Sequence, residues 1–292
     1  MSSSESSPAQ GNPLGVSGIE FIEYATAQPQ ALGGLLQRMG FVPIARHRSR
    51  EVTLFRQGAM NLIVNADPVA VAGQAEAAKR PALSGFALRV RDAGDAWQRA
   101  LDLGAWDIPM RASAMELNIP GIRGVGDSQI YFVDRHGDYS IYDVDFEPVP
   151  DVAQQPPALA GLHYFGVVQT IGFDRTADWA DFYRELLGFS VLPEGKYFGV
   201  MPKGTLLESP SHNFYLQLVE PPLVPEVLYW EERLVRIGFG APDVRAAVRA
   251  LEARDIVFAD HDPGVPSDKG ALTQIYLGGV TFELVISHFG GN

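Results

Sequence analysis

Short apolar and polar runs recur along this chain in a fixed order. Each half of the sequence carries two copies of one pattern, in which a strand is followed by an amphipathic helix and then by further strands. The first strands of the four copies are GIEFIEYA, GFALRVRD, LHYFGVVQ and LVRIGFGA. Because self-similarity in a fixed order indicates tandem structural units, we expect four βαβββ-like modules arranged as two pairs.

The helices and closing strands repeat as well. Apolar residues recur with a period of about 3.6 residues in QALGGLLQRMGF, AGDAWQRALDLGA, TADWADFYRELLGF and VRAAVRALEARD. Gly40, Gly104 and Gly188 stand where C-terminal helix caps are expected. The closing strands IYFVD and SIYDVDF of the second module match QIYLGG and VTFELVI of the fourth. The pattern therefore favours an α+β protein with open, curved, mixed sheets.

Two segments of different composition divide the chain. Residues 1–12 are rich in serine, and we expect them to be a disordered tail. The segment PVPDVAQQPPALAG, near the middle, has the proline and glutamine content of a linker. We therefore predict one domain over residues 13–147, a linker over 148–160, and a second domain over 161–292 that carries the site.

Charge and composition exclude several classes of function. The net charge of −12 argues against nucleic acid or an anionic membrane as a partner. There is no cysteine, which excludes disulfides and thiolate chemistry. No apolar run is long enough to span a membrane, and the N-terminus does not read as a signal peptide. A cytoplasmic protein with a small-molecule partner is expected.

Strand parity predicts which side chains face a cavity in the second half. Alternate residues of a strand share one face. In TFELVIS, Phe282, Leu284 and Ile286 form an apolar set that is suited to pack on a helix. Glu283 then points to the opposite, concave face.

The same argument applies to two other strands. In LVRIGFG, Val235, Ile237 and Phe239 are expected to face the helix, which places Arg236 on the concave face. In NFYLQLV, the apolar alternation leaves Gln217 on that face too. Polar side chains from separate strands are thus predicted to meet in one concave site.

The first strand of the second half adds His163 to this set. Either face of that strand is apolar, so a satisfied interior histidine is the plain alternative to a ligand. The first half has no comparable set, because Glu20 is its only ionisable residue at the equivalent first-strand position. We therefore expect no metal in the first half, whose role would be to support the second half by packing.

Several motifs resemble a known family. NPLGVSGIEFIEYA, RHRSREVTLFRQGAMNLIVNADP, MELNIPGIRGVGD and IYFVDRHGDYSIYDVDF closely resemble the N-terminal domain of bacterial 4-hydroxyphenylpyruvate dioxygenases. The second half resembles the catalytic domain of that family through LHYFGVV, DWADFYRELLGF, LTQIY and VTFELVI. The resemblance implies the vicinal oxygen chelate fold in each half.

The resemblance also implies a metal site. In that family two His and one Glu hold one Fe(II), which leaves positions open for a 2-oxo acid and O₂. The first His falls on His163, the carboxylate on Glu283, and a substrate-contacting glutamine on Gln274. The second His falls on Arg236, whose guanidinium has no lone pair to donate. Gln217 occupies a position that supplies a ligand in glyoxalase-like relatives.

Three functions stay open at this point. The first is a non-haem Fe(II) dioxygenase that acts on an aromatic or 2-oxo acid. His163, Glu283 and Gln217 would hold Fe(II) or another divalent metal, and Arg236 and Gln274 would contact the substrate. The second is a metal-dependent lyase, isomerase or glyoxalase-like enzyme. The third is a metal-free binding or degenerate protein in which Arg236 pairs with Glu283. The sequence leaves the oligomeric state open, a homo-oligomer included.

Overall fold

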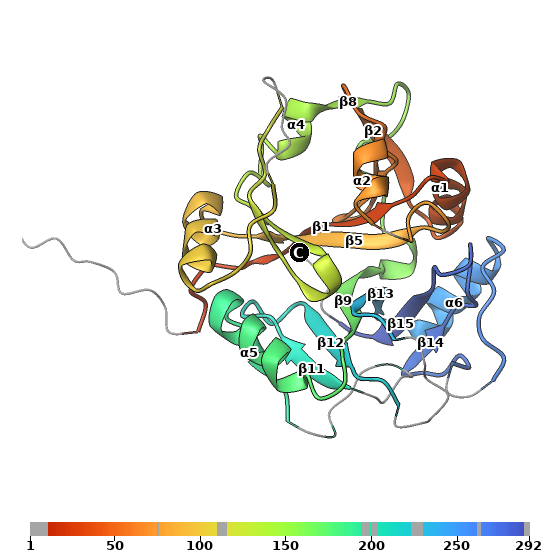
Figure 1. The fold of residues 1–292 in the computed structure, drawn as a ribbon. Coiled ribbons are helices and arrows are strands. Elements are labelled where there is room, and N and C mark those ends of the chain that lie inside the picture. The colour runs from red at the N-terminus through yellow and green to blue at the C-terminus, as the bar shows by residue number, and fades with distance from the viewer. Residues whose placement is uncertain are drawn as a thin grey trace, which may run out of the picture.

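The computed structural model contains two mixed β-sheets, one from each half of the chain, with helices at their flanks (Figure 1). It describes residues 11–74, 76–109, 116–193, 195, 199, 204–222, 230–261 and 264–288. In the part of the chain that it describes, no helix is both long and apolar enough to cross a membrane.

The first sheet has eight strands in the order β6-β7-β5-β1-β4-β3-β2-β8. The elements of this half, in chain order, are β1 (Gly18–Ala25), α1 (Pro29–Arg38), β2 (Val42–His47), β3 (Val52–Gln57), β4 (Met60–Asn65), α2 (Pro68–Ala72), β5 (Ala82–Arg89), α3 (Ala93–Asp102), β6 (Gly121–Arg123), the 3₁₀ turn η1 (Val125–Asp127), β7 (Gln129–Val133), α4 (Ile141–Asp145) and β8 (Phe146–Pro148).

The second sheet has seven strands in the order β10-β11-β12-β9-β13-β15-β14. Its half begins with the 3₁₀ turn η2 (Leu159–Gly161) and continues with β9 (His163–Thr170), α5 (Thr176–Leu187), β10 (Ser190–Val191), β11 (Thr205–Glu208), β12 (Tyr215–Val219), β13 (Arg233–Ala241), α6 (Val244–Glu252), β14 (Gly270–Leu272) and β15 (Phe282–Ile286).

The pairing of strands confirms the predicted architecture of paired βαβββ modules. In each half the first strands of the two modules run antiparallel at the centre of the sheet, β1 beside β5 and β9 beside β13. The last main strand of each module then lies parallel to its first strand, as β4 does to β1 and β15 to β13. This arrangement is the vicinal oxygen chelate fold, and it is neither a closed parallel barrel nor a doubly wound sheet.

The three predicted capping glycines end their helices as expected. Gly40, Gly104 and Gly188 have φ angles of 96°, 91° and 79°, a left-handed conformation that a residue without a Cβ adopts at little cost. At the N-terminus of α6, the Asp243 side chain accepts a hydrogen bond from Ala246 N at 2.8 Å. These local signals fix the lengths of the helices.

The segment SIYDVDF was expected to be a strand, and this expectation is wrong for most of its length. Ile141–Asp145 form the short helix α4, and only Phe146–Pro148 continue as β8. The reason is a capping box: the Asp143 carboxylate accepts hydrogen bonds from Ser140 N at 2.7 Å and from its hydroxyl at 2.8 Å. These local bonds outweigh the strand pattern.

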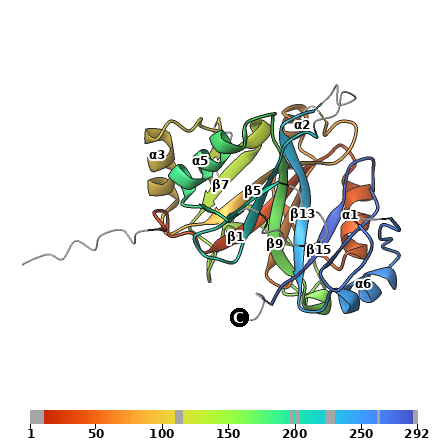
Figure 2. The same ribbon diagram turned by 90° about the horizontal axis from the view of Figure 1, so that it is seen from below.

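The two sheets pack back to back across one large apolar core. The rings of Phe41 and Phe239 lie 5.8 Å apart, and those of Phe86 and Phe214 lie 6.2 Å apart, each pair joining the two halves. Figures 1 and 2 show α3 beside α5 at one flank and α1 beside α6 at the other. Because the apolar faces are turned toward each other, the concave faces of the two sheets point in opposite directions.

The prediction of which residues face the core is confirmed in β15, and it is wrong at the start of β13. Phe282 and Leu284 are fully buried in the shared core, whereas Ile286, at the end of β15, is 37% exposed. The pairing of β13 with β9 shifts register between Leu234 and Arg236, so Leu234, not Val235, enters the core. A bulge of this kind depends on the partner strand, and the sequence of β13 alone does not reveal it.

The segment predicted as a linker is bonded to the first half. Val149 N donates to Ile44 O at 2.8 Å, and Gly58 N donates to Pro156 O at 2.9 Å. Leu159 N donates to the Gln57 side chain at 2.9 Å. The connection between the two sheets therefore follows the surface of the first half.

Gly126 provides a test of the contact between the two halves. Its φ is 61°, and a Cβ built on it would overlap the main-chain carbonyl oxygen of Glu232 in the second half. We expect Gly126→Ala to lower the free energy of unfolding by about 2–3 kcal/mol, through backbone strain and steric overlap. Gly137→Ala is the matched control, since nothing lies within 4 Å of its added Cβ. Denaturant unfolding that leaves both variants equally stable would contradict this packing.

Candidate functional site

Arg236 and Glu283 meet on the concave face of the second sheet. Arg236 Nε donates a hydrogen bond to Glu283 Oε2 at 3.0 Å. The two side chains are only 11% and 4% exposed. The ion pair proposed from the sequence is therefore present, and it is shielded from the solvent that would weaken it.

His163 has its own hydrogen-bond partners. Nδ1 lies 3.1 Å from the main-chain oxygen of Gly161, and Nε2 lies 3.0 Å from the Ser287 hydroxyl. A carbonyl oxygen can only accept, so Nδ1 carries the proton and Nε2 accepts from Ser287. Burial lowers the pKa of His163, an effect that the bond to Gly161 opposes. The imidazole is thus held neutral near pH 7.

His163 and Glu283 have their hydrogen-bond partners at different positions along the strands. Ser287, the partner of His163, is four residues beyond Glu283, which corresponds to roughly 13 Å of extended chain. On the neighbouring strand, His163 is paired with Gly240 and Arg236 with Val168. The structure thus brings Arg236 to Glu283 and leaves His163 at the end of the face.

Gln217 lies near Glu283, at a small cavity. This cavity has a volume of about 20 Å³, and its lining includes Phe165, Tyr215 and Val285. Such a volume accommodates about one water molecule. It is far too small for an aromatic 2-oxo acid.

The main chain at Gly199 lies against the Glu283 carboxylate. A Cβ added there would overlap Glu283 Oε1. Gln274 is exposed and lines neither this cavity nor the larger one in the first half. Pro202, which falls at a substrate-contacting position by resemblance, lies outside the described residues.

These residues do not fit the iron that the resemblance implies. One carboxylate is neutralised by a guanidinium, one imidazole is bonded to a hydroxyl, and an arginine stands where the second imidazole is expected. Arginine cannot ligate a cation and repels it. Within the described ranges, no cluster of three or more His, Cys, Asp or Glu side chains could hold a metal ion.

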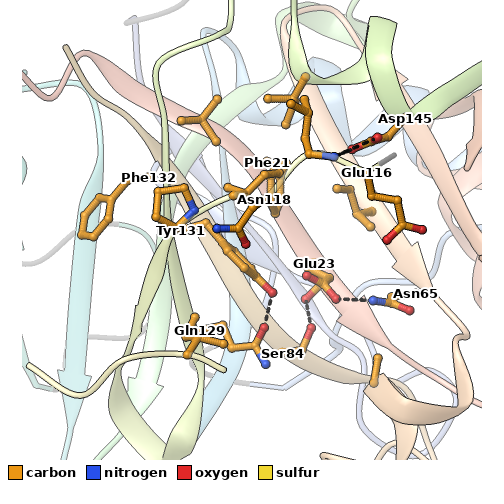
Figure 3. Close-up of a pocket in the computed structure, with 18 of the residues that line it drawn as sticks. Phe21, Glu23, Asn65, Ser84, Glu116, Asn118, Gln129, Tyr131, Phe132 and Asp145 are labelled. Atoms are coloured by element: carbon orange, nitrogen blue, oxygen red, sulfur yellow. Dashed lines mark hydrogen bonds between the residues drawn. The ribbon is translucent and has the colours of Figure 1, made fainter. Parts of the chain in front are cut away.

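A much larger cavity lies on the concave face of the first sheet (Figure 3). Its volume is about 680 Å³, within the range of small-molecule sites in proteins. Strands β1, β3, β4, β5 and β7 line it, together with α2, α3 and the segment 116–120.

A row of polar side chains crosses the floor of this cavity. It consists of Asn65 on β4, Glu23 on β1, Ser84 on β5 and Gln129 on β7, four strands that are neighbours in the sheet. Glu23 on β1 is paired with Gly85 on β5, and Gly85 is paired in turn with Gln129 on β7. We call these four residues the polar row.

Glu23 is the buried acid of the polar row. Its side chain accepts a hydrogen bond from Asn65 Nδ2 at 2.8 Å, and the residue is 6% exposed. Ser84 Oγ donates to its main-chain oxygen at 3.3 Å. Burial raises the pKa of Glu23 from its ordinary value of 4.5, and hydrogen bonds from Asn65, Ser84 and Tyr131 oppose this shift. Among the described residues, no Lys, Arg or His forms a salt bridge with it.

An apolar surface lies beside the polar row. Phe21 precedes Glu23 by two residues and therefore shares its face of β1. The rings of Phe21 and Tyr131 lie 5.6 Å apart and are tilted by 45°. The Tyr131 hydroxyl donates to the side-chain oxygen of Gln129, as Figure 3 shows. Ile63 completes this surface.

Several other charged groups of the cavity have partners of their own. Arg50 forms an ion pair with Glu116, and Asp145 accepts from Leu117 N at 3.2 Å. His47 packs edge-on against the Phe146 ring. Burial lowers the pKa of His47, and the carboxylates of Asp145 and Glu116 oppose this shift. Glu23 thus differs from Glu116, whose partner is a guanidinium, in having only neutral partners.

Sequence reasoning did not single out Glu23. In β1 it considered Glu20, which is buried in an ion pair with Arg89 Nε at 2.5 Å. The available signal was a second glutamate in GIEFIEYA, flanked by Ile22 and Tyr24, which pack into the shared core. A charged residue between two core positions must face the other side of the sheet.

Comparisons with known proteins agree with this fold. The family described as hydroxyphenylpyruvate dioxygenase, HPPD, N-terminal matches residues 10–147. The 4-hydroxyphenylpyruvate dioxygenase of Pseudomonas sp. (strain P.J. 874) is 40% identical over 74% of this chain, which spans 60% of that relative's length. The enzyme of the same name from Pseudomonas aeruginosa is 29% identical over 94% of this chain and 89% of its own length.

The fold of both halves is also found in solved structures. A mutant of 4-hydroxymandelate synthase from Streptomyces coelicolor superposes with a TM-score of 0.74 at 18% identity, and covers 95% of each chain. At this identity the likeness concerns the fold alone. The sequence matches and the motifs that they contain show that this chain is a divergent member of the 4-hydroxyphenylpyruvate dioxygenase family.

Proposed function

We propose that this chain is a metal-independent, small-molecule-binding member of its family and not an Fe(II) dioxygenase. The observation that carries the proposal is the buried ion pair between Arg236 and Glu283, 3.0 Å apart. An Fe(II) ion would have to displace a guanidinium that already satisfies the carboxylate. The charge of Arg236 would then remain buried beside the metal, which is unfavourable.

The sizes of the two cavities support the same proposal. The space beside Glu283 and Gln217 is about 20 Å³, whereas the cavity in the first half is about 680 Å³. A ligand of the size of an aromatic acid fits only the second of these volumes. The binding function is therefore assigned to the first half of the chain.

A metal-dependent enzyme is the second candidate, and the orientation of His163 favours it. Its Nδ1 donates to a main-chain carbonyl, which is the support that metal-binding histidines commonly have. In this alternative His163, Glu283 and Gln217 would hold Fe(II) or another divalent metal, and Arg236 would turn to the substrate. The reaction would be an oxygenation of an aromatic or 2-oxo acid, or an isomerase- or lyase-type step.

A metal titration separates the two candidates. We expect the wild-type protein to bind Fe(II) weakly under anaerobic conditions and to turn over no 4-hydroxyphenylpyruvate. Arg236→His removes the competing charge and adds an imidazole, so Fe(II) affinity should rise at least about tenfold. Arg245→His is the matched control, because Arg245 is exposed on α6 and pairs with Asp268. Tight, stoichiometric Fe(II) binding by the wild type, with no gain in Arg236→His, would refute the proposal.

Stability measurements test whether the ion pair belongs to the fold. Arg236→Met leaves Glu283 buried without its cation and should lower the free energy of unfolding by about 3 kcal/mol or more. Adding Glu283→Leu should restore most of this loss, since a buried ion pair can be replaced by apolar side chains of similar volume. Arg245→Met, at an exposed pair, should change little. A double variant as unstable as Arg236→Met would show that the pair is not the cause.

A further inference from the structure

We propose that the cavity of the first half binds a small organic cation, an ammonium group carried on a ring. The ammonium group would lie at Glu23 and the ring against Phe21 and Tyr131. This inference deepens the proposed binding function, because it names the site and the class of ligand. It does not depend on whether the second half holds a metal, since the two concave faces point in opposite directions.

The charges around the cavity favour a cation. Among its lining residues Asp and Glu outnumber Arg, and lysine does not occur among them. The chain as a whole carries a net charge of −12, which attracts cations and repels anions. The carboxylate of a 2-oxo acid would meet Glu23 and the other acids at close range, so substrates of that class are disfavoured here.

The polar row supplies the counter-charge for the cation. Asn65 donates to the Glu23 carboxyl group, but the residues around it bring no positive charge. A buried acid whose partners are neutral is stabilised when a cation binds. The Asn65 side-chain oxygen already accepts from Asp67 N at 3.0 Å, whereas the Gln129 side-chain oxygen accepts from Tyr131 and keeps a second lone pair. The two oxygens of the Glu23 carboxylate and the second lone pair of the Gln129 oxygen suit an ammonium group, which has three N–H donors.

The apolar surface beside the polar row fits the rest of the ligand. Phe21 and Glu23 are two residues apart on β1, which separates their Cα atoms by roughly 7 Å. A ring attached to an amine through a two-carbon arm spans a comparable distance. The tilted rings of Phe21 and Tyr131, 5.6 Å apart, present both a face and an edge to such a ring. Phe21 is 2% exposed, so its position is fixed by packing.

The stability of the free protein gives an independent test of Glu23. Asn65 on β4, Ser84 on β5 and Tyr131 on β7 face it. The charged and titratable groups that line the rest of the cavity are the Arg50–Glu116 pair, His47, Asp67, Asp107, Arg123, Asp127, Asp134, Arg135 and Asp145. Because burial raises the pKa of Glu23, the folded protein binds more protons than the unfolded chain between pH 4.5 and this raised pKa, so stability falls as the pH rises through that interval.

Glu23→Gln removes this penalty and keeps an acceptor for Asn65. Its melting temperature should exceed that of the wild type by roughly 2 °C or more at neutral pH. The difference should shrink as the pH falls below 4.5, where Glu23 becomes protonated in both the folded and the unfolded protein. Thermal unfolding at several pH values measures it. A difference that does not depend on pH would contradict the role of Glu23 as a buried acid without a cation.

The binding test uses three probes of similar size. They are 2-phenylethylamine, which is a cation near pH 7, 2-phenylethanol, which is neutral, and phenylacetate, which is an anion. Titration calorimetry is carried out on the full chain in the presence of a chelator. We expect the amine to bind at least about tenfold more tightly than the alcohol, because a charge-assisted hydrogen bond is stronger than a neutral one. We expect phenylacetate not to bind.

Variants locate the site. Glu23→Gln should abolish the preference for the amine over the alcohol, whereas Glu147→Gln, an exposed charge change on β8 of the same sheet, should preserve it. Phe21→Leu should weaken both the amine and the alcohol by a similar factor, because it removes a ring and no charge. Glu23→Gln and Phe21→Leu act on different parts of the ligand, so the test survives if one of them folds poorly.

Two results would overturn the inference. One is equal binding of the amine and the alcohol, which would assign the polar row to a neutral, hydroxyl-bearing ligand. The other is a preference for the amine that persists in Glu23→Gln, which would place the cation elsewhere. Neither result touches the proposed absence of a metal, because that proposal stands or falls with the Fe(II) titration of Arg236→His.

Discussion

The burial of one apolar layer between two sheets is the constraint on which the rest of the structure depends. Each strand has two faces, and in both halves one of these faces packs into the shared core, as Phe86 and Phe214 do. The remaining face of each sheet is then concave and turned outward. Glu23 and Glu283, both on strands inside the sheets, each lie on a concave surface, where a carboxylate avoids the cost of burial in the apolar core.

The buried carboxylate has a different kind of partner in each half. In the second half Arg236 crosses from the neighbouring strand to Glu283, and the space beside the pair is too small for a ligand. In the first half Glu23 has an amide as its partner and opens onto a large cavity. An internal ion pair closes one surface, and its absence keeps the other available for a molecule from solution. The same fold thus supports opposite outcomes on the concave faces of its two sheets.

Much of the fold could be predicted from the sequence, because its signals are local. The glycine at position 188 ends a helix by its own conformation, and parity in β15 separates Glu283 from the core. The capping box of Ser140 was overlooked in a segment with an apolar strand pattern. The bulge at Val235 and the cavity around Glu23 could not be predicted in the same way. They depend on the alignment of strands that are far apart in the sequence, and resemblance directed attention to the metal position in the other half.

The bonded connection between the two sheets also limits how the molecule can move. Val149, Pro156 and Leu159 are each held to the first half by a hydrogen bond, and η2 leads directly into β9. A hinge needs a few residues that are free to rotate, and this segment provides none at its bonded positions. The two halves should therefore respond to a ligand as one rigid body.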